Sequence, residues 1–123
     1  KALKLRRRDG MLQYLTALAY LNQEDYLAAI EILEQEHDDV FALLNREVLL
    51  AEAYRSTGQY AKALPVYVAS LKYGDNALTR YYQAQCYLEL KDFSAARETL
   101  EIARQLDPDN LDVQNLLEKL NHD

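Results

Sequence analysis

The stretch YYQAQCYLELKDFSAARETLEIARQLDP, residues 81–108, decides the fold because its alanines and aromatics recur at the same spacing in an earlier part of the chain. That earlier part is LLAEAYRSTGQYAKALPVYVASLKYGD, residues 49–75, and a third copy precedes it. The copies share four positions, spaced 34 and then 33 residues apart: Ala17/Ala51/Ala84, Tyr20/Tyr54/Tyr87, Tyr26/Tyr60/Phe93 and Ala29/Ala63/Ala96. A nearly constant period of this length is typical of a solenoid built from stacked supersecondary units.

Each copy has the pattern of two helices joined by a short turn. In the second copy, a run with helical spacing of apolar residues is broken at residues 57–59, and another amphipathic run ends at Gly74. Glycine commonly follows the end of a helix because it accepts the left-handed conformation. The third copy ends at Pro108, which cannot continue a helix, and either Asp109 or Asn110 can cap the next one. The repeat unit is therefore predicted to be an antiparallel helical hairpin.

These residues resemble the tetratricopeptide repeat (TPR) family, whose period is about 34 residues. The third copy is the best match, and the first is the weakest because Phe41 stands where a turn proline is expected. The resemblance implies an all-α TPR solenoid of three hairpins with a C-terminal capping helix. The expected division is a basic arm at 1–9, repeats at 10–43, 44–76 and 77–110, and the capping helix at 111–123.

Close packing explains the repeated residue types. The two helices of a hairpin are expected to meet at small residues, Ala51 with Ala63 and Ala84 with Ala96, while the repeated aromatics fill the space between neighbouring hairpins. The capping helix is expected to cover the last hairpin with one apolar face, formed by Leu111, Val113, Leu116, Leu117 and Leu120.

The charge is divided unevenly along the chain. The net charge of the 123 residues is −6, but the first eight residues hold five cations and no acid, so residues 9–123 carry −11. Nucleic-acid binding is not expected of such a body, because phosphate recognition needs clustered cations. The five cations are Lys1, Lys4, Arg6, Arg7 and Arg8.

The basic arm has two interpretations. It can contact anionic lipid at about 1 kcal/mol per cation, or it is a solvated tail or the junction with a preceding helix. No apolar run reaches the roughly 20 residues of a membrane span. Since the sequence begins with Lys1, we expect a fragment or a processed chain, and both a cytoplasmic and a bacterial periplasmic location stay open.

No motif for catalysis, metal or cofactor binding is recognised. Cys86 is the one cysteine and aligns with Ala53 and Ala19, so we expect a small packing residue there and not a nucleophile. The cluster Glu36-His37-Asp38-Asp39 is better explained as helix capping than as a metal site, since His122 is the one other histidine. The acidic run at 107–112 has Leu111 where a calcium loop needs an oxygen ligand. We therefore expect a protein that is not an enzyme and that binds neither a cofactor nor a metal ion.

The resemblance implies a binding groove, because the first helix of each TPR hairpin lines the concave face. The heat-shock-chaperone clamp of lysine and asparagine is absent, since the matching positions hold Tyr14, Leu18, Leu49, Leu78 and Tyr82. Several of the groove side chains are expected to be exposed aromatics or leucines, among them Leu15 and Leu88, and to bind a largely apolar ligand. The candidate groove residues are Tyr14, Leu18, Leu21, Val48, Glu52, Arg55, Tyr81, Tyr82 and Gln85.

The expected function is that of a non-enzymatic adaptor, scaffold or chaperone-like module that binds a segment of another protein. The alternative is that the same face mediates homo-oligomerisation or docks within a longer chain. Pro65 is expected within the return helix of the second hairpin, where it either makes a tolerated kink or shapes a ligand surface.

Overall fold

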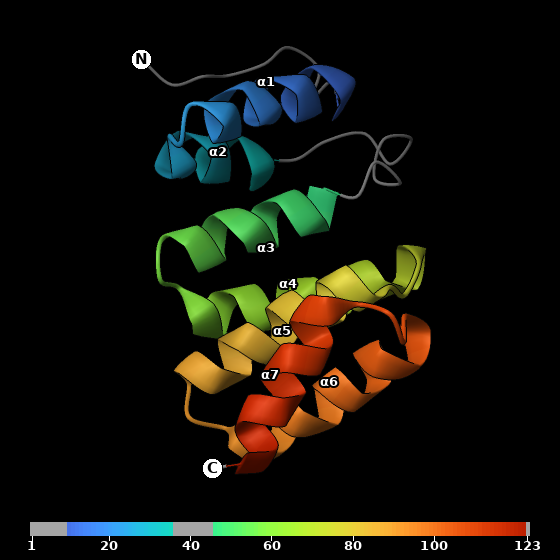
Figure 1. Ribbon diagram of the computed structural model, residues 1–123. Helices are drawn as coiled ribbons and strands as arrows, with labels where there is room; N and C mark the ends of the chain where they lie inside the picture. The colour runs from blue at the N-terminus through green and yellow to red at the C-terminus, as the bar shows by residue number, and fades with distance from the viewer. Residues whose placement is uncertain (1–9, 36–45, 123) are drawn as a thin grey trace.

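The computed structural model describes residues 10–35 and 46–122, and over these residues the protein is all-α, as the sequence predicts. Figure 1 shows the helices stacked in chain order, from α1 at one end to α6 and α7 at the other. The arm at 1–9, the cluster at 36–39 and Phe41 lie outside the described residues. The helices are α1 Gly10–Asn22, α2 Tyr26–Leu33, α3 Arg46–Ser56, α4 Tyr60–Ser70 with the short 3-10 helix η3 Leu71–Tyr73, α5 Ala77–Glu89, α6 Phe93–Leu106 and α7 Leu111–His122.

The three hairpin turns have the same backbone geometry. One residue in each turn has a positive φ: 60° at Glu24, 78° at Gly58 and 68° at Lys91. In each turn, the residue that follows the one with positive φ donates its backbone N–H to the carbonyl of the repeated tyrosine. The N–O distances are 2.9 Å for Tyr20, 2.8 Å for Tyr54 and 2.9 Å for Tyr87. These bonds satisfy carbonyls that a helix end leaves free. The left-handed position is therefore a property of the repeat, and two of its three occupants are not glycine.

The small residues of the repeat lie in the core. All six repeated alanines are fully buried, as close packing of the helices requires: Ala17, Ala29, Ala51, Ala63, Ala84 and Ala96. One core cluster runs from α1 to α5 and includes the fully buried Tyr67, and a second joins α5, α6 and α7. Of the repeated aromatics, Phe93 is 50% exposed, which differs from the expectation. The others are buried or half-buried in the core clusters: Tyr20, Tyr26, Tyr54, Tyr60 and Tyr87.

The last helix caps the stack with a narrower face than the sequence suggests. Val113, Leu117 and Leu120 are buried in the second core cluster and Leu116 is half-buried. Leu111 was wrongly included, since it is 68% exposed. Leu111 is two residues before Val113, and two residues correspond to more than half a turn of an α-helix. The two side chains therefore lie on opposite sides of α7. Asn110, and not Asp109, caps α7, because its side-chain oxygen accepts from the Val113 N–H at 3.1 Å.

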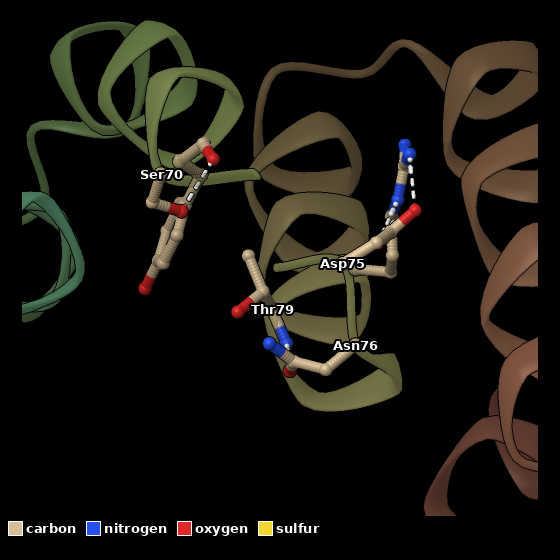
Figure 2. A network of polar contacts seen from close by, with 6 residues as sticks. Ser70, Asp75, Asn76 and Thr79 are labelled. Carbon is tan, nitrogen blue, oxygen red and sulfur yellow. Dashed lines mark hydrogen bonds and ion pairs between the residues drawn. The ribbon is translucent and has the colours of Figure 1, made fainter. Parts of the chain in front are cut away.

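Polar contacts fix the junction between the second and third hairpins (Figure 2). Gly74, with φ of 143°, follows η3, and the Asn76 side chain then caps α5 by accepting from the Thr79 N–H at 2.8 Å. Asp75 and Arg80 form a bidentate pair with both N–O distances at 2.9 Å. The Arg80 guanidinium holds the pKa of the Asp75 carboxyl below its usual value.

Pro65 lies within α4 and its side chain is exposed. The helix continues past it to Ser70, so this proline is accommodated on the solvent side without ending the helix. None of the described helices meets the length and apolarity needed to cross a membrane.

Candidate partner-binding groove

The nine candidate groove residues come from α1, α3 and α5, and all nine side chains are half-buried. The expectation of exposed side chains is therefore wrong for the aromatics Tyr14, Tyr81 and Tyr82 and for Leu88, but Leu15 of α1 is exposed as expected, at 53%. Tyr82 stacks on the buried Tyr67 of α4, with ring centroids 6.2 Å apart and an interplanar angle of 24°. Tyr81 lies beside Tyr82, at 5.9 Å between centroids and 57° between planes. Tyr82 packs against the core cluster that includes α4 of the preceding hairpin, whereas Tyr81 packs against the cluster of α5, α6 and α7.

Arg55 is the centre of the polar contacts on this face. Its Nε donates to the Tyr67 hydroxyl at 3.1 Å, and its guanidinium carbon lies 4.1 Å from the centroid of the Tyr82 ring. A second nitrogen lies 3.9 Å from the Glu52 carboxylate. Arg55 thus links α3 to both α4 and α5. Its side chain remains 22% exposed to solvent.

The surroundings keep these groups in one charge state. Burial lowers the Arg55 pKa, but the hydrogen bond with Tyr67 and the Glu52 charge raise it by more, so its net pKa is raised. Burial also raises the pKa of Tyr67 to about 12, although the Arg55 cation opposes this. Arg55 is therefore a permanent cation and Tyr67 a neutral hydroxyl at any physiological pH.

A cleft of about 280 Å³ opens beside Arg55. It brings together Arg55, Tyr81 and Gln85 from the candidate set, and Leu88, which the sequence also assigned to the groove. The other six candidates do not line this cleft. The complete lining is Arg55, Tyr60, Tyr81, Gln85, Leu88, Glu89 and Leu116.

Three of the lining residues were missed by the sequence analysis. Glu89 follows Gln85 by four positions on α5, so helical periodicity alone places it on the same face. Leu116 belongs to α7, which the sequence treated as a cap and not as a wall of the groove. Tyr60 is one of the repeated aromatics, and the repeat pattern assigned it to packing between hairpins.

The thiol is a packing group, and the acidic residues that the structure describes are not gathered into a metal site. Cys86 is fully buried, and burial raises its pKa to about 11, so the thiol stays protonated and acts as a packing group, as expected. Among residues 10–35 and 46–122, no three His, Cys, Asp or Glu residues are grouped so that they could hold a metal ion.

Stacked antiparallel hairpins with matching turns and buried alanines at repeated positions define an α-helical repeat solenoid. Residues 54–120 match the family model of the tetratricopeptide repeat, and the chain belongs to that family. TPR domains are in general non-catalytic modules for protein interaction.

Solved TPR structures share this fold at low sequence identity. The first TPR domain of Spaghetti (RPAP3) bound to the HSP90 peptide SRMEEVD has a TM-score of 0.82 at 16% identity, covering 98% of this chain and 97% of that one. The Yersinia enterocolitica type III secretion chaperone SycD in complex with a peptide of the translocator YopD has a TM-score of 0.77 at 17% sequence identity. The match covers 91% of this chain and 92% of that one. PcrH in complex with the chaperone-binding region of PopB has a TM-score of 0.68 at 19% sequence identity, and the match covers 96% of each chain. No curated protein sequence matches the chain.

Proposed function

We propose that the protein is a non-enzymatic adaptor or chaperone-like module that binds a segment of another protein along α1, α3 and α5, with the cleft beside Arg55 as its anchor point. The observation that carries the proposal is the cleft itself, which gathers residues of α3, α4, α5 and α7 around one open volume. Its lining combines apolar side chains with a few polar groups, as ligand-binding pockets in general do.

The lining suits a segment with an apolar anchor and polar neighbours. Tyr81, Leu88 and Leu116 offer aromatic and aliphatic surface, while Arg55, Gln85 and Glu89 offer one cation, one amide and one anion. The polar groups can fix the direction of a bound backbone or a flanking charge, and the apolar groups supply the burial that drives binding.

Three related folds support the choice of a peptide as ligand. The RPAP3 domain is bound to an HSP90 peptide, SycD to a YopD peptide, and PcrH to the chaperone-binding region of PopB. For the present chain, we infer from these three complexes that the ligand is a peptide, and from its own cleft where that peptide is anchored. The expected absence of the lysine and asparagine clamp argues for a ligand anchored by apolar contacts and not by a terminal carboxylate.

The test begins with selection of a phage-displayed library of short random peptides on the immobilised protein. A synthetic copy of the enriched peptide is then titrated by fluorescence anisotropy against the wild type, Gln85→Arg and Gln105→Arg. Gln85 lines the cleft, whereas Gln105 is exposed on α6, so the second variant makes the same change outside the groove.

We expect Gln85→Arg to weaken binding at least about tenfold, roughly 1.4 kcal/mol, and Gln105→Arg to leave the affinity unchanged. Circular dichroism verifies that both variants are folded. The proposal fails if no peptide is enriched, or if both variants bind as the wild type does.

A further inference from the structure

Glu89 is the anionic residue in the lining of the cleft beside Arg55. It is exposed, and none of the ion pairs among the described residues includes its carboxylate. The equivalent positions of the first two repeats hold Asn22 and Ser56, so the packing of the repeat does not require an acid here. The carboxylate of Glu89 is therefore available to a ligand.

The position of Glu89 in its helix makes a bound cation favourable. Glu89 is the last residue of α5, and the last turn of that helix contains no basic residue. The C-terminal end of a helix carries a partial negative charge, which a cation stabilises and a carboxylate increases. A cation bound at this place would offset both the carboxylate and the end of the helix.

Arg55, the cation of the cleft, already has partners within the protein. One of its nitrogens lies 3.9 Å from the Glu52 carboxylate, its Nε donates to Tyr67, and its guanidinium lies over the ring of Tyr82. Two acids, Glu52 and Glu89, therefore accompany one base, Arg55, and the three residues together carry a net charge of −1. The charge that a ligand has to complement is negative.

The charges that flank the cleft in the sequence cancel in pairs. On α7, Asp112 and Lys119 lie four residues before and three residues after Leu116, on the same side of that helix. Lys91 and Asp92 follow α5 in the turn that leads to α6. Each pair has no net charge, so neither pair offsets the negative charge at the cleft.

The rest of the lining suits a long basic side chain. Leu88 and Leu116 offer aliphatic surface, and Tyr60 and Tyr81 are half-buried aromatic rings. Lysine and arginine bury their aliphatic stems on such surfaces, and their charged heads are attracted to the faces of aromatic rings. The cleft of about 280 Å³ is close in size to the smallest pockets for whole small molecules, so it can hold a basic side chain together with an apolar one.

Building on the function proposed above, we propose that the segment bound in the cleft carries a lysine or arginine next to its apolar anchor. Glu89 determines this specificity by pairing with the cation, while the leucines and tyrosines of the lining cover the stem of the basic side chain and the anchor. The net charge of −6 on the chain adds a long-range attraction for a basic segment.

The test uses the peptide that the phage selection enriches and a copy in which its basic residue is replaced by glutamate. Both peptides are titrated by fluorescence anisotropy against the wild type, Glu89→Gln, Glu89→Lys and Glu98→Lys. Glu98 is exposed on α6 and does not line the cleft, so Glu98→Lys makes the same change in net charge elsewhere. Circular dichroism verifies that all variants are folded.

For the selected peptide, we expect Glu89→Gln to weaken binding about threefold, because an ion pair at an exposed position is weak. Glu89→Lys should weaken binding at least about tenfold, because repulsion replaces attraction. Glu98→Lys should stay within about twofold of the wild type, because salt screens charges outside the cleft. The peptide with glutamate should bind Glu89→Lys more tightly than it binds the wild type.

The possible failures separate the specificity from the site. An enriched peptide without lysine or arginine next to its apolar anchor overturns the role of Glu89, and so does an affinity that Glu89→Lys leaves unchanged. In both cases the cleft stands as the binding site provided that Gln85→Arg weakens binding. If no peptide is enriched, or if Gln85→Arg leaves the affinity of the peptide unchanged, the site is overturned together with its specificity.

Discussion

The contacts of Arg55 allow a quantitative prediction for the variant Arg55→Leu, which keeps much of the aliphatic volume and removes the guanidinium. Tyr67 is fully buried, so its hydroxyl loses the hydrogen bond from Arg55 without access to water. An unsatisfied buried polar group costs about 1 to 3 kcal/mol. The lost cation–π contact with Tyr82 adds about 0.5 to 1 kcal/mol. The variant is expected to lower the free energy of unfolding by about 1.5 to 4 kcal/mol.

A double-mutant cycle with Tyr67→Phe separates the two contributions. In the Tyr67→Phe background there is no hydroxyl to leave unsatisfied, so Arg55→Leu should cost only the contact with Tyr82, about 0.5 to 1 kcal/mol. The coupling between Arg55 and Tyr67 is then about 1 to 3 kcal/mol.

The assay is urea unfolding followed by helical circular dichroism, with the slope of the transition compared among the four proteins. A cost of Arg55→Leu below about 0.5 kcal/mol, or single-variant costs that simply add, would refute the role given to this hydrogen bond.

Four further predictions concern the repeat itself. Ala96→Leu should cost about 1 to 3 kcal/mol in a urea titration, because the alanine is fully buried at a helix contact; an unchanged midpoint would contradict the close packing. Lys91→Gly should stabilise by about 0.5 to 1 kcal/mol, since φ at Lys91 is 68°, and a loss of stability would argue against this backbone geometry. Cys86 should resist Ellman's reagent in the native protein and react in urea, because burial raises its pKa to about 11; rapid native labelling would show that the site opens. Arg80 lowers the pKa of Asp75 in the folded state, so the pair contributes stability above the unfolded pKa of about 3.9 and loses it as the pH falls through the lower folded value. The stability difference between wild type and Asp75→Asn should therefore shrink below about pH 4, and a difference that does not change with pH would exclude the pair as its cause.

The repeat pattern predicted most of the fold because it reports on local and periodic packing. The aligned alanines proved to be fully buried, and the cysteine among them proved to be a packing residue for the reason that the alignment gave. Two glycines that break the helical spacing placed two of the connections: Gly58 marks the turn within the second hairpin, and Gly74 marks the junction between the second and third hairpins.

The candidate groove was harder to predict, because its contacts depend on side chains from different hairpins. The sequence assigned Arg55 and Tyr82 to the same face but gave no sign that the guanidinium lies over the ring and reaches Tyr67. Leu116 joins the cleft because α7 packs back against α5 and α6; the sequence predicted this packing but not that Leu116 would line a cleft together with residues of α3 and α4.

The central claim, that a partner segment binds in the cleft, is tested most directly by NMR. The selected peptide is titrated into the isotope-labelled protein, and the changes in backbone amide shifts are mapped on the structure. We predict that the largest changes lie around Tyr81, Gln85 and Leu88 of α5 and Leu116 of α7. Changes concentrated on the exposed side of α4 or α6, with those four residues unaffected, would contradict it.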